Sequence, residues 1–381
     1  MHTPPFTPSP PFSRRQLLAT ALTAPLWHSQ AQAQGDPTAA PAVLVKRALQ
    51  FPRDLGSHPD TATEWWYVTG ELQAQSRLFG FQLTFFRSRV PGTQTMRSGF
   101  AAKQLHFAHA AVTDVTGKRL RHDQRIARSS GNPQVDLAQA SETDTDVTLR
   151  DWSLQRRGSS YLARANGEGF AFDLNLQETQ PLLLQGDQGL SRKGPEASQT
   201  SFYYSLPQLR VSGQLTLDGQ RQAVTGRAWL DHEWSQSMLA PQAVGWDWIG
   251  MNLHDGSVLT AFRLRDKAGG TVWAGGSWRA KDASIPVVFG HDQVSFEPVR
   301  RWTSPASGTT YPVQWQVTVP DASSSPRRFT VRALVDNQVL DSSRSTGAIY
   351  WEGLSELLDE QGQSVGRGYL EMTGYAKPLS L

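Results

Sequence analysis

Residues 79–85 are Phe-Gly-Phe-Gln-Leu-Thr-Phe, a run in which large apolar side chains alternate with small or polar ones. A period of two is typical of a β-strand with one buried face, because successive side chains point to opposite sides of the strand. Fourteen further runs have strand-like patterns: 64–70, 105–112, 147–152, 161–165, 170–176, 208–217, 224–229, 246–253, 257–264, 271–278, 313–319, 328–334, 348–351 and 368–375. So many strands leave little room for helices.

Turn residues separate these runs. Those typical of hairpin loops are Asp114 to Gly117, Asn166-Gly167, Asp218-Gly219, Asp255-Gly256 and Gly269-Gly270. We therefore expect neighbouring strands to be antiparallel, and closure into barrels or packed sheets would remove most exposed strand edges. The sequence predicts an all-β fold of antiparallel β-barrel domains.

Composition excludes several classes of protein. The chain of 381 residues has no cysteine, which rules out thiolate catalysis, cysteinyl metal sites and disulfides. Its formal net charge of +3 is too small to indicate a nucleic-acid partner. The length is sufficient for two domains.

The N-terminus is typical of an exported protein. Ser13-Arg14-Arg15-Gln16-Leu17-Leu18 opens an uncharged run to Trp27, and Ala31-Gln32-Ala33 supplies a cleavage site. We predict a twin-arginine signal peptide over 1–33 and a periplasmic or secreted protein. The mature chain has no apolar run long enough to cross a membrane as a helix.

Breaks rich in Pro, Gly and Ser suggest where the mature chain divides. They lie at 189–200, 238–243 and 321–326. Taking the middle break as the boundary, we predict a linker over 34–43, an N-terminal domain over 44–235 and a C-terminal domain over 236–381.

The densest group of polar and aromatic residues is 229–234, Trp-Leu-Asp-His-Glu-Trp. In an extended strand, His232 and Trp234 lie on one face, and Asp231 and Glu233 lie on the other. One of these faces could enter a cavity. Alternatively, His232 is a hydrogen-bonded core histidine and the carboxylates cap a turn.

Three more segments place an acid two residues from an aromatic ring. The pairs are Glu64 with Trp66, Tyr350 with Glu352, and Tyr369 with Glu371. Burial among rings should raise the pKa of such a carboxyl group, which would then serve as a general acid near neutral pH. The other interpretation is that each acid accepts hydrogen bonds that stabilise the fold.

Two further patterns do not predict a catalytic site. His106 and His109 are three residues apart, so on a regular strand they point to opposite faces and would need a bulge to share a metal. Gln236 occupies the position where a metalloprotease motif starting at His232 would have its second histidine, and the chain has no P-loop or dinucleotide fingerprint, so we predict no metal site and no cofactor. Residues 362–366, Gly-Gln-Ser-Val-Gly, match the G-x-S-x-G nucleophile pattern but lack the helix that should follow, and we predict a hairpin loop there.

Trp-rich motifs distributed over the chain resemble those of the AttH/CrtC family, over roughly residues 44–378. They are Phe51-Pro52-Arg53-Asp54, Thr63-Glu64-Trp65-Trp66-Tyr67-Val68-Thr69-Gly70, Gly226 to Trp234, Gly245-Trp246-Asp247-Trp248, Tyr350-Trp351-Glu352-Gly353 and Gly366 to Tyr375. The resemblance implies two lipocalin-like domains in a calycin-type arrangement, with an apolar cavity.

The resemblance also implies candidate functions. One branch of the family comprises carotenoid 1,2-hydratases, which add water across an isoprenoid double bond without a redox cofactor, and His232 and Trp234 align with its His-x-Trp element. The candidate catalytic residues are His232, Trp234, Asp231, Glu64 and Glu371. The candidate ligand-binding residues are Trp66, Trp246, Trp248, Tyr350, Glu352 and Tyr369.

Three functions remain open at this point. The protein is an enzyme with hydratase-like acid chemistry on an apolar alkene, a non-catalytic carrier of a lipid or isoprenoid, or a secreted hydrolase. The other branch of the family, exported AttH-like proteins, implies a partner in a transport system of the lipoprotein-release type. In every case the expected ligand is a hydrophobic small molecule or lipid.

Overall fold

The computed structural model describes residues 43–237, 239–321 and 326–379. The predicted signal peptide, and the predicted linker up to residue 42, lie outside the described residues. Within the described part, no helix is long and apolar enough to cross a membrane.

The described residues contain 23 strands and three short 3-10 helices, Arg53–Leu55, Pro91–Thr93 and His291–Gln293. The first sheet comprises β1 (Thr63–Ala74), β2 (Arg77–Arg89), β3 (Gln104–Asp114), β4 (Arg119–Ser129), β5 (Ala138–Ala140), β6 (Asp146–Leu149), β7 (Trp152–Arg157), β8 (Ser160–Gly167), β9 (Phe170–Gln177), β10 (Leu183–Leu184), β11 (Leu190–Arg192), β12 (Thr200–Leu217) and β13 (Gln220–Ser235). The second sheet comprises β14 (Gly245–Leu253), β15 (Val258–Arg265), β16 (Thr271–Arg279), β17 (Val287–Phe289), β18 (Ser295–Thr303), β19 (Thr310–Val319), β20 (Arg327–Ala333), β21 (Val339–Ser342), β22 (Ala348–Leu358) and β23 (Ser364–Met372).

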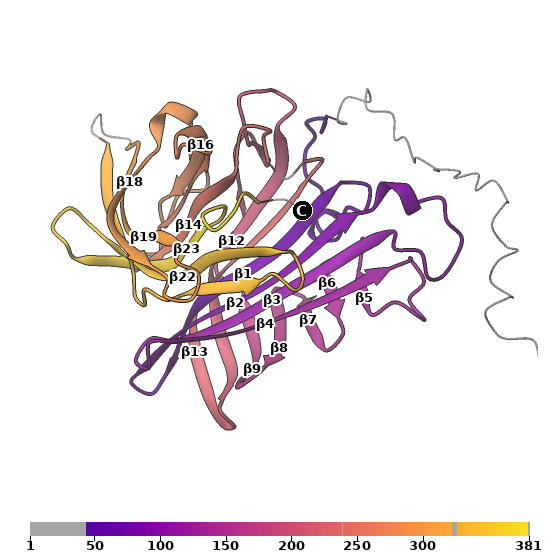
Figure 1. Cartoon of the computed structure of the whole chain (residues 1–381). Coiled ribbons are helices and arrows are strands. Elements are labelled where there is room, and N and C mark those ends of the chain that lie inside the picture. Colours follow the sequence, from indigo (N-terminus) through magenta and orange to yellow (C-terminus); the bar gives the residue numbers. More distant parts are fainter. Residues whose placement is uncertain (1–42, 238, 322–325, 380–381) are drawn as a thin grey trace, which may run out of the picture. The chain divides into compact units, whose positions relative to one another are not determined.

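Each sheet is built from antiparallel pairs, as the hairpin turns predicted. The first sheet has the order β4-β3-β2-β1-β13-β12-β9-β8-β7-β6-β5, and β4 at one end contacts β5 at the other, so this sheet nearly closes into a barrel. The second has the order β17-β16-β15-β14-β23-β22-β20-β19-β18. Figure 1 shows the two groups of strands, purple to pink for the first sheet and brown to yellow for the second. The prediction of an all-β fold with two antiparallel domains is confirmed.

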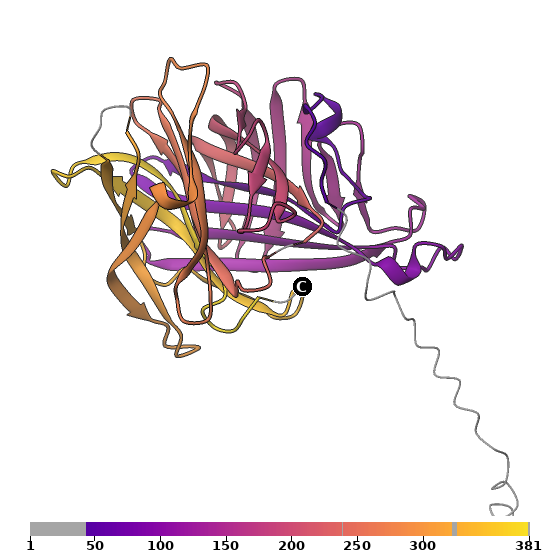
Figure 2. The ribbon, with the colours of Figure 1, turned by 90° about the horizontal axis from the view of Figure 1, so that it is seen from above.

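Side chains fill the interior of each sheet. The core of the first sheet includes Trp66, Val68 and Trp234, and that of the second includes Trp315 and Trp351. Alternation then turns the neighbouring residues outward, because side chains of a strand point to opposite faces in turn. Outward residues of β1 and β13 meet those of β14, β15 and β23 in a third apolar cluster between the two sheets. Figure 2 shows the strands of the second sheet lying against those of the first.

Several features differ from the strand pattern expected from sequence, since the strands β5, β10, β11, β17, β18 and β21 lie outside the predicted runs. The run 147–152 is not one strand, because Arg150 has a left-handed φ of 57° and the chain turns there between β6 and β7. β4 was also not predicted, since its sequence, Arg-Leu-Arg-His-Asp-Gln-Arg-Ile-Ala-Arg-Ser, is mostly polar and lacks an apolar alternation. The predicted hairpin loop at 362–366 is confirmed in part, because residues 359–363 join β22 to β23 but residues 364–366 already belong to β23.

Candidate functional site

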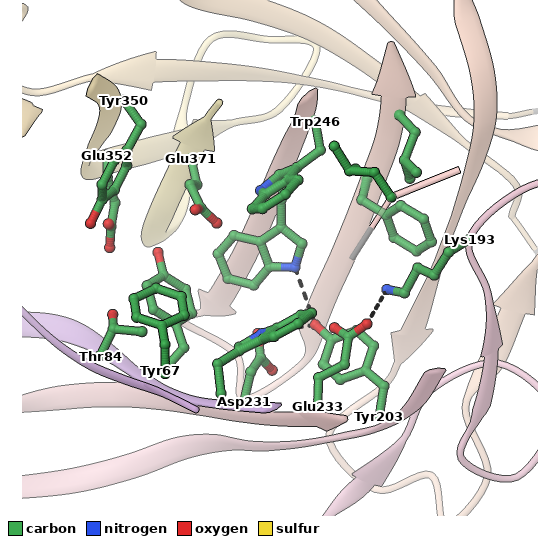
Figure 3. A pocket seen from close by; sticks show the side chains of 16 residues that line it. Tyr67, Thr84, Lys193, Tyr203, Asp231, Glu233, Trp246, Tyr350, Glu352 and Glu371 are labelled. Carbon is green, nitrogen blue, oxygen red and sulfur yellow. Dashed lines mark hydrogen bonds and ion pairs between the residues drawn. The ribbon is translucent and has the colours of Figure 1, made fainter. Parts of the chain in front are cut away.

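A cavity opens between the facing surfaces of the two sheets, with about 740 Å³ of unfilled space when its opening to solvent is included. Its lining combines aromatic rings with acidic groups (Figure 3). The lining residues are Trp65, Tyr67, Thr84, Phe86, Lys193, Tyr203, Asp231, Glu233, Leu239, Trp246, Trp248, Phe262, Leu264, Tyr350, Glu352 and Glu371. An apolar recess with a few convergent polar groups is the usual form of a small-molecule site.

Two buried carboxyl groups stand together on the wall formed by the second sheet. Glu352 of β22 lies directly opposite Glu371 of β23 in the antiparallel register, so both side chains are on the same face. Burial raises the pKa of Glu371 to about 7. Burial, and then the nearby Glu371, raises the pKa of Glu352 well above its usual value. Two adjacent buried carboxyl groups cannot both be ionised at low cost, so the pair keeps at least one proton near neutral pH.

The Glu352 carboxyl has no hydrogen bond of good geometry in the described part of the chain. The hydroxyls of Tyr67 and Tyr350 are close enough to favour its charged form, but burial outweighs them. Tyr350 is itself held by His109 of β3, whose Nδ1 is 2.7 Å from the tyrosine hydroxyl. An unpaired buried carboxyl at a cavity wall is costly, and a ligand or water in the cavity would satisfy it.

Aromatic rings lie beside this pair. Trp248 of β14 is directly opposite Glu371 in the register of β14 and β23. Its indole Nε1 donates to the Tyr203 hydroxyl at 3.1 Å, and its ring meets Tyr67 and Trp229 edge to face. A tryptophan face stabilises a nearby cation by about 2 kcal/mol when water is excluded.

The first sheet contributes Asp231 and Glu233 of β13 to the same cavity. Asp231 accepts hydrogen bonds from Ser205 at 2.5 Å, Trp229 at 2.6 Å and Tyr203 at 3.0 Å. Burial nonetheless raises the pKa of Asp231 to about 7. The expected alternation on this strand is confirmed, since His232 and Trp234 point the other way, into the core of the first sheet.

Glu64 belongs to a separate buried cluster inside the first sheet. Its carboxylate accepts hydrogen bonds from Ser57 Oγ at 2.7 Å, from the backbone N of His58 at 2.9 Å and from Arg87 Nε at 2.8 Å. His58 Nδ1 lies 2.8 Å from it and His232 Nε2 lies 2.9 Å from it.

The expectation that burial raises the pKa of Glu64 is wrong. Burial alone would raise it, but hydrogen bonds from His232 and His58, together with the positive charge of Arg87, hold it well below its usual value. Glu64 is therefore a carboxylate at neutral pH and not a proton donor.

Aromatic stacking immobilises the same cluster. The Trp66 and His232 rings stack with centroids 4.6 Å apart, and His58 stacks on Trp234 at 3.7 Å with an interplanar angle of 7°. Tyr204 lies with its hydroxyl 2.9 Å from His232 Nδ1. Burial lowers the pKa of His232 to about 4, so its ring is neutral at pH 7.

Three groups of this cluster, on His58, Glu64 and His232, have ligand atoms within 4.8 Å of one another, which is close enough to hold a metal ion. Arg87 opposes that use, because its guanidinium is 2.8 Å from Glu64 and would repel a cation. The carboxylate also already accepts several hydrogen bonds. The arrangement is better suited to fixing the segment before β1 than to binding a metal.

The structure divides the sequence-predicted residues into two places. Those that line the cavity are Asp231, Glu371, Trp246, Trp248, Tyr350 and Glu352. Those within the first sheet are Glu64, Trp66, His232 and Trp234. Tyr369 packs in the apolar cluster between the sheets, with its hydroxyl close to the backbone of Gly80.

Sequence analysis missed several lining residues. Trp65 and Tyr67 could have been predicted, because alternation places their side chains on the face of β1 opposite to that of Trp66. The same alternation places Asp231 and His232 on opposite faces of β13. Lys193 carried no such signal, since it lies in a stretch rich in turn residues between β11 and β12.

The fold and the cavity define a class of protein, an all-β protein of two lipocalin-like antiparallel domains with an aromatic and acidic recess between them. The model of the AttH-like family matches residues 42–375, and the chain belongs to this family. No curated protein matches the chain in sequence.

Several solved structures are similar, among them two that match over most of the chain. A candidate AttH from Nitrosomonas europaea is 43% identical, with a TM-score of 0.80 over 88% of this chain and 99% of that chain. Kievitone hydratase from Nectria haematococca is 15% identical, with a TM-score of 0.64 over 89% of this chain and 95% of that chain, and this similarity is one of fold.

The raised pKa of Glu371 predicts a pH-dependent stability. Between its usual pKa of 4.5 and about 7, the folded chain binds the proton more tightly than the unfolded chain, so the contribution of Glu371 to stability falls as pH rises. At 1.36 kcal/mol per pKa unit, the loss is on the order of 3 kcal/mol. Urea unfolding at pH 4 and pH 8 measures this loss. The difference in the free energy of unfolding between the wild type and Glu371→Gln should change between the two pH values.

The comparison with this variant is needed because other buried groups change the stability of the fold with pH in the opposite direction. The lowered pKa values of His106, His109 and His232 make stability rise with pH below about 6.5. A difference between the wild type and Glu371→Gln that does not change with pH would show that Glu371 has an ordinary pKa.

Proposed function

We propose that the protein binds an unsaturated apolar small molecule in the cavity between the sheets and adds water across its double bond. The observation that carries this proposal is the buried pair of Glu352 and Glu371, which face each other on adjacent strands and open onto an aromatic recess. Kievitone hydratase, a protein of similar fold, is a hydratase by name, which fits the proposal.

The proposed reaction uses the two carboxyl groups in opposite roles. The protonated member of the pair donates its proton to one alkene carbon, so that a C–H bond forms and the π bond breaks. The resulting carbocation lies beside the Trp248 ring, which stabilises positive charge. A water molecule then attacks the cationic carbon, and its surplus proton passes to the ionised member of the pair. The net change is the addition of one water, without oxidation or reduction.

The proposed ligand contact is dominated by apolar surface. Trp65, Trp246, Phe86 and Phe262 contribute rings to the cavity, and burial of apolar surface supplies about 25 cal/mol per Å². We propose that this occurs in the periplasm or outside the cell, which the twin-arginine sequence around Arg14 and Arg15 supports.

The proposal is tested by incubating the mature protein with terminally unsaturated isoprenoids in ¹⁸O-labelled water. We expect the intrinsic tryptophan fluorescence to change on binding and the product to gain the mass of one labelled water. Binding without a labelled product would instead identify a carrier, because the same recess holds an apolar ligand without chemistry. Absence of both signals would contradict a ligand site in this cavity.

A further inference from the structure

The cavity has two polar ends of different kinds, separated by indole rings. Figure 3 shows Glu352 and Glu371 at one end, Trp246 in the middle and Lys193 with Glu233 at the other end. The acid pair belongs to the second sheet, whereas Glu233 is on β13 of the first. The hydration proposed above uses only the end with the acid pair.

Lys193 is held in place over the cavity wall. Its ammonium Nζ is 3.0 Å from Glu233 Oε1, and it lies 4.6 Å and 4.4 Å from the ring centroids of Tyr203 and Phe262. Glu233 is fixed in turn by Ser201, whose hydroxyl donates to Oε1 at 2.5 Å. The lysine side chain is 17% exposed and Glu233 is 6% exposed, so the pair is largely removed from water.

This pair has donor capacity left over. An ammonium group has three N–H donors, and the contacts of Lys193 at the site are one carboxylate and two ring faces. A ligand group with an oxygen acceptor could therefore bind Lys193 without displacing Glu233. If that group is a hydroxyl, it could also donate a hydrogen bond to a carboxylate.

The local charge favours an uncharged group over an anion. The charges of Lys193 and Glu233 cancel, and Asp231 on the same strand as Glu233 is partly ionised near neutral pH because burial raises its pKa to about 7. The net charge at this end is therefore zero or negative. An incoming carboxylate would be attracted by one group and repelled by two, whereas a hydroxyl or carbonyl avoids this repulsion.

We infer that the ligand is amphipathic: an uncharged hydroxyl or carbonyl head binds at Lys193 and Glu233, and its unsaturated apolar chain extends past Trp246 to Glu352 and Glu371. This inference rests on the proposed function and adds the class of substrate to it. Lys193 is then a specificity-determining residue that selects and orients the ligand.

The inference is tested with three probes of one carbon skeleton: farnesol, farnesene and farnesoic acid. Quenching of tryptophan fluorescence gives the dissociation constant of each for the full mature chain. We expect farnesol to bind about tenfold more tightly than farnesene, since only farnesol can accept a hydrogen bond from the charged Lys193 ammonium. Farnesol should also bind more tightly than farnesoic acid.

The variant Lys193→Met should abolish the preference, so that farnesol and farnesene bind with equal affinity. Lys193→Arg should retain the preference, and Lys267→Met, at an exposed turn position, should behave as the wild type. Unfolding midpoints identify any variant that fails to fold, and Lys193→Arg then provides the comparison.

Several results would overturn the inference. These are equal binding of farnesol and farnesene by the wild type, tighter binding of farnesoic acid, or an unchanged preference in Lys193→Met. If the preference is found but no probe is hydrated, the inference stands and only the proposed chemistry fails. If none of the probes binds, the ligand site itself is refuted together with the inference.

Discussion

Glu352→Gln and Glu371→Gln should each lower the rate of alkene hydration by about 10²- to 10⁴-fold, the usual contribution of a positioned acid or base. An amide has nearly the same shape as the carboxyl but cannot donate an acidic proton to carbon or take one from water. Ligand affinity should change little, because the apolar wall of the cavity is retained. Single-turnover rates and fluorescence titrations of both variants separate the two effects.

The pH dependence of the rate provides an independent check on this pair. Because burial raises the pKa of Glu371 to about 7 and raises that of Glu352 well above its usual value, the proton needed for the first step is present below pH 7 and is lost as pH rises. The rate should therefore fall on the alkaline side. Glu356→Gln is a matched control, because Glu356 is on β22 but pairs with Arg332 away from the cavity. A rate unaffected by both cavity substitutions would exclude the pair as the proton donor.

Among the sequence patterns, strand periodicity predicted the most features of the fold and of the site. Alternation over 79–85 and similar runs predicted the all-β fold, and hairpin turns predicted antiparallel pairing. The same alternation correctly separated His232 and Trp234 from Asp231 and Glu233. Periodicity succeeds here because the facing of a side chain is a local property of one strand.

Periodicity could not predict which faces of the strands pack inside a sheet and which line the cavity. Glu64 with Trp66 and Tyr350 with Glu352 have the same acid and ring spacing, but one pair packs inside the first sheet and the other faces the cavity. The partners of Glu64 come from other strands: His232 from β13, and Arg87, which is 23 residues after Glu64 and becomes its neighbour through the pairing of β1 with β2. Hydrogen bonds from His232 and His58, together with the positive charge of Arg87, reverse the direction of the pKa shift. His232 and Arg87 are both distant from Glu64 in sequence.

Arg87→Met is expected to have the largest effect on folding. Arg87 is buried, its Nε donates to Glu64, and its remaining N–H groups donate to the carbonyls of Thr61 and His58 and to Gln104. Methionine keeps much of the apolar volume but leaves the buried Glu64 carboxylate without its positive partner. Breaking a buried ion pair in this way costs about 3 to 5 kcal/mol, which urea unfolding would measure.

An exposed arginine provides the control for this prediction. Arg332 lies 2.7 Å from Glu356 with its side chain 48% exposed, and Arg332→Met should cost no more than about 1 kcal/mol, the usual value of a surface ion pair. The double variant Glu64→Gln with Arg87→Met should recover part of the loss, since it no longer buries an unpaired charge. Equal losses in Arg87→Met and Arg332→Met would mean that Glu64 is not held as a buried carboxylate. The segment before β1 would then be joined to β2 by other contacts, such as the backbone hydrogen bond from Arg89 N to the Ala62 carbonyl, rather than by Arg87.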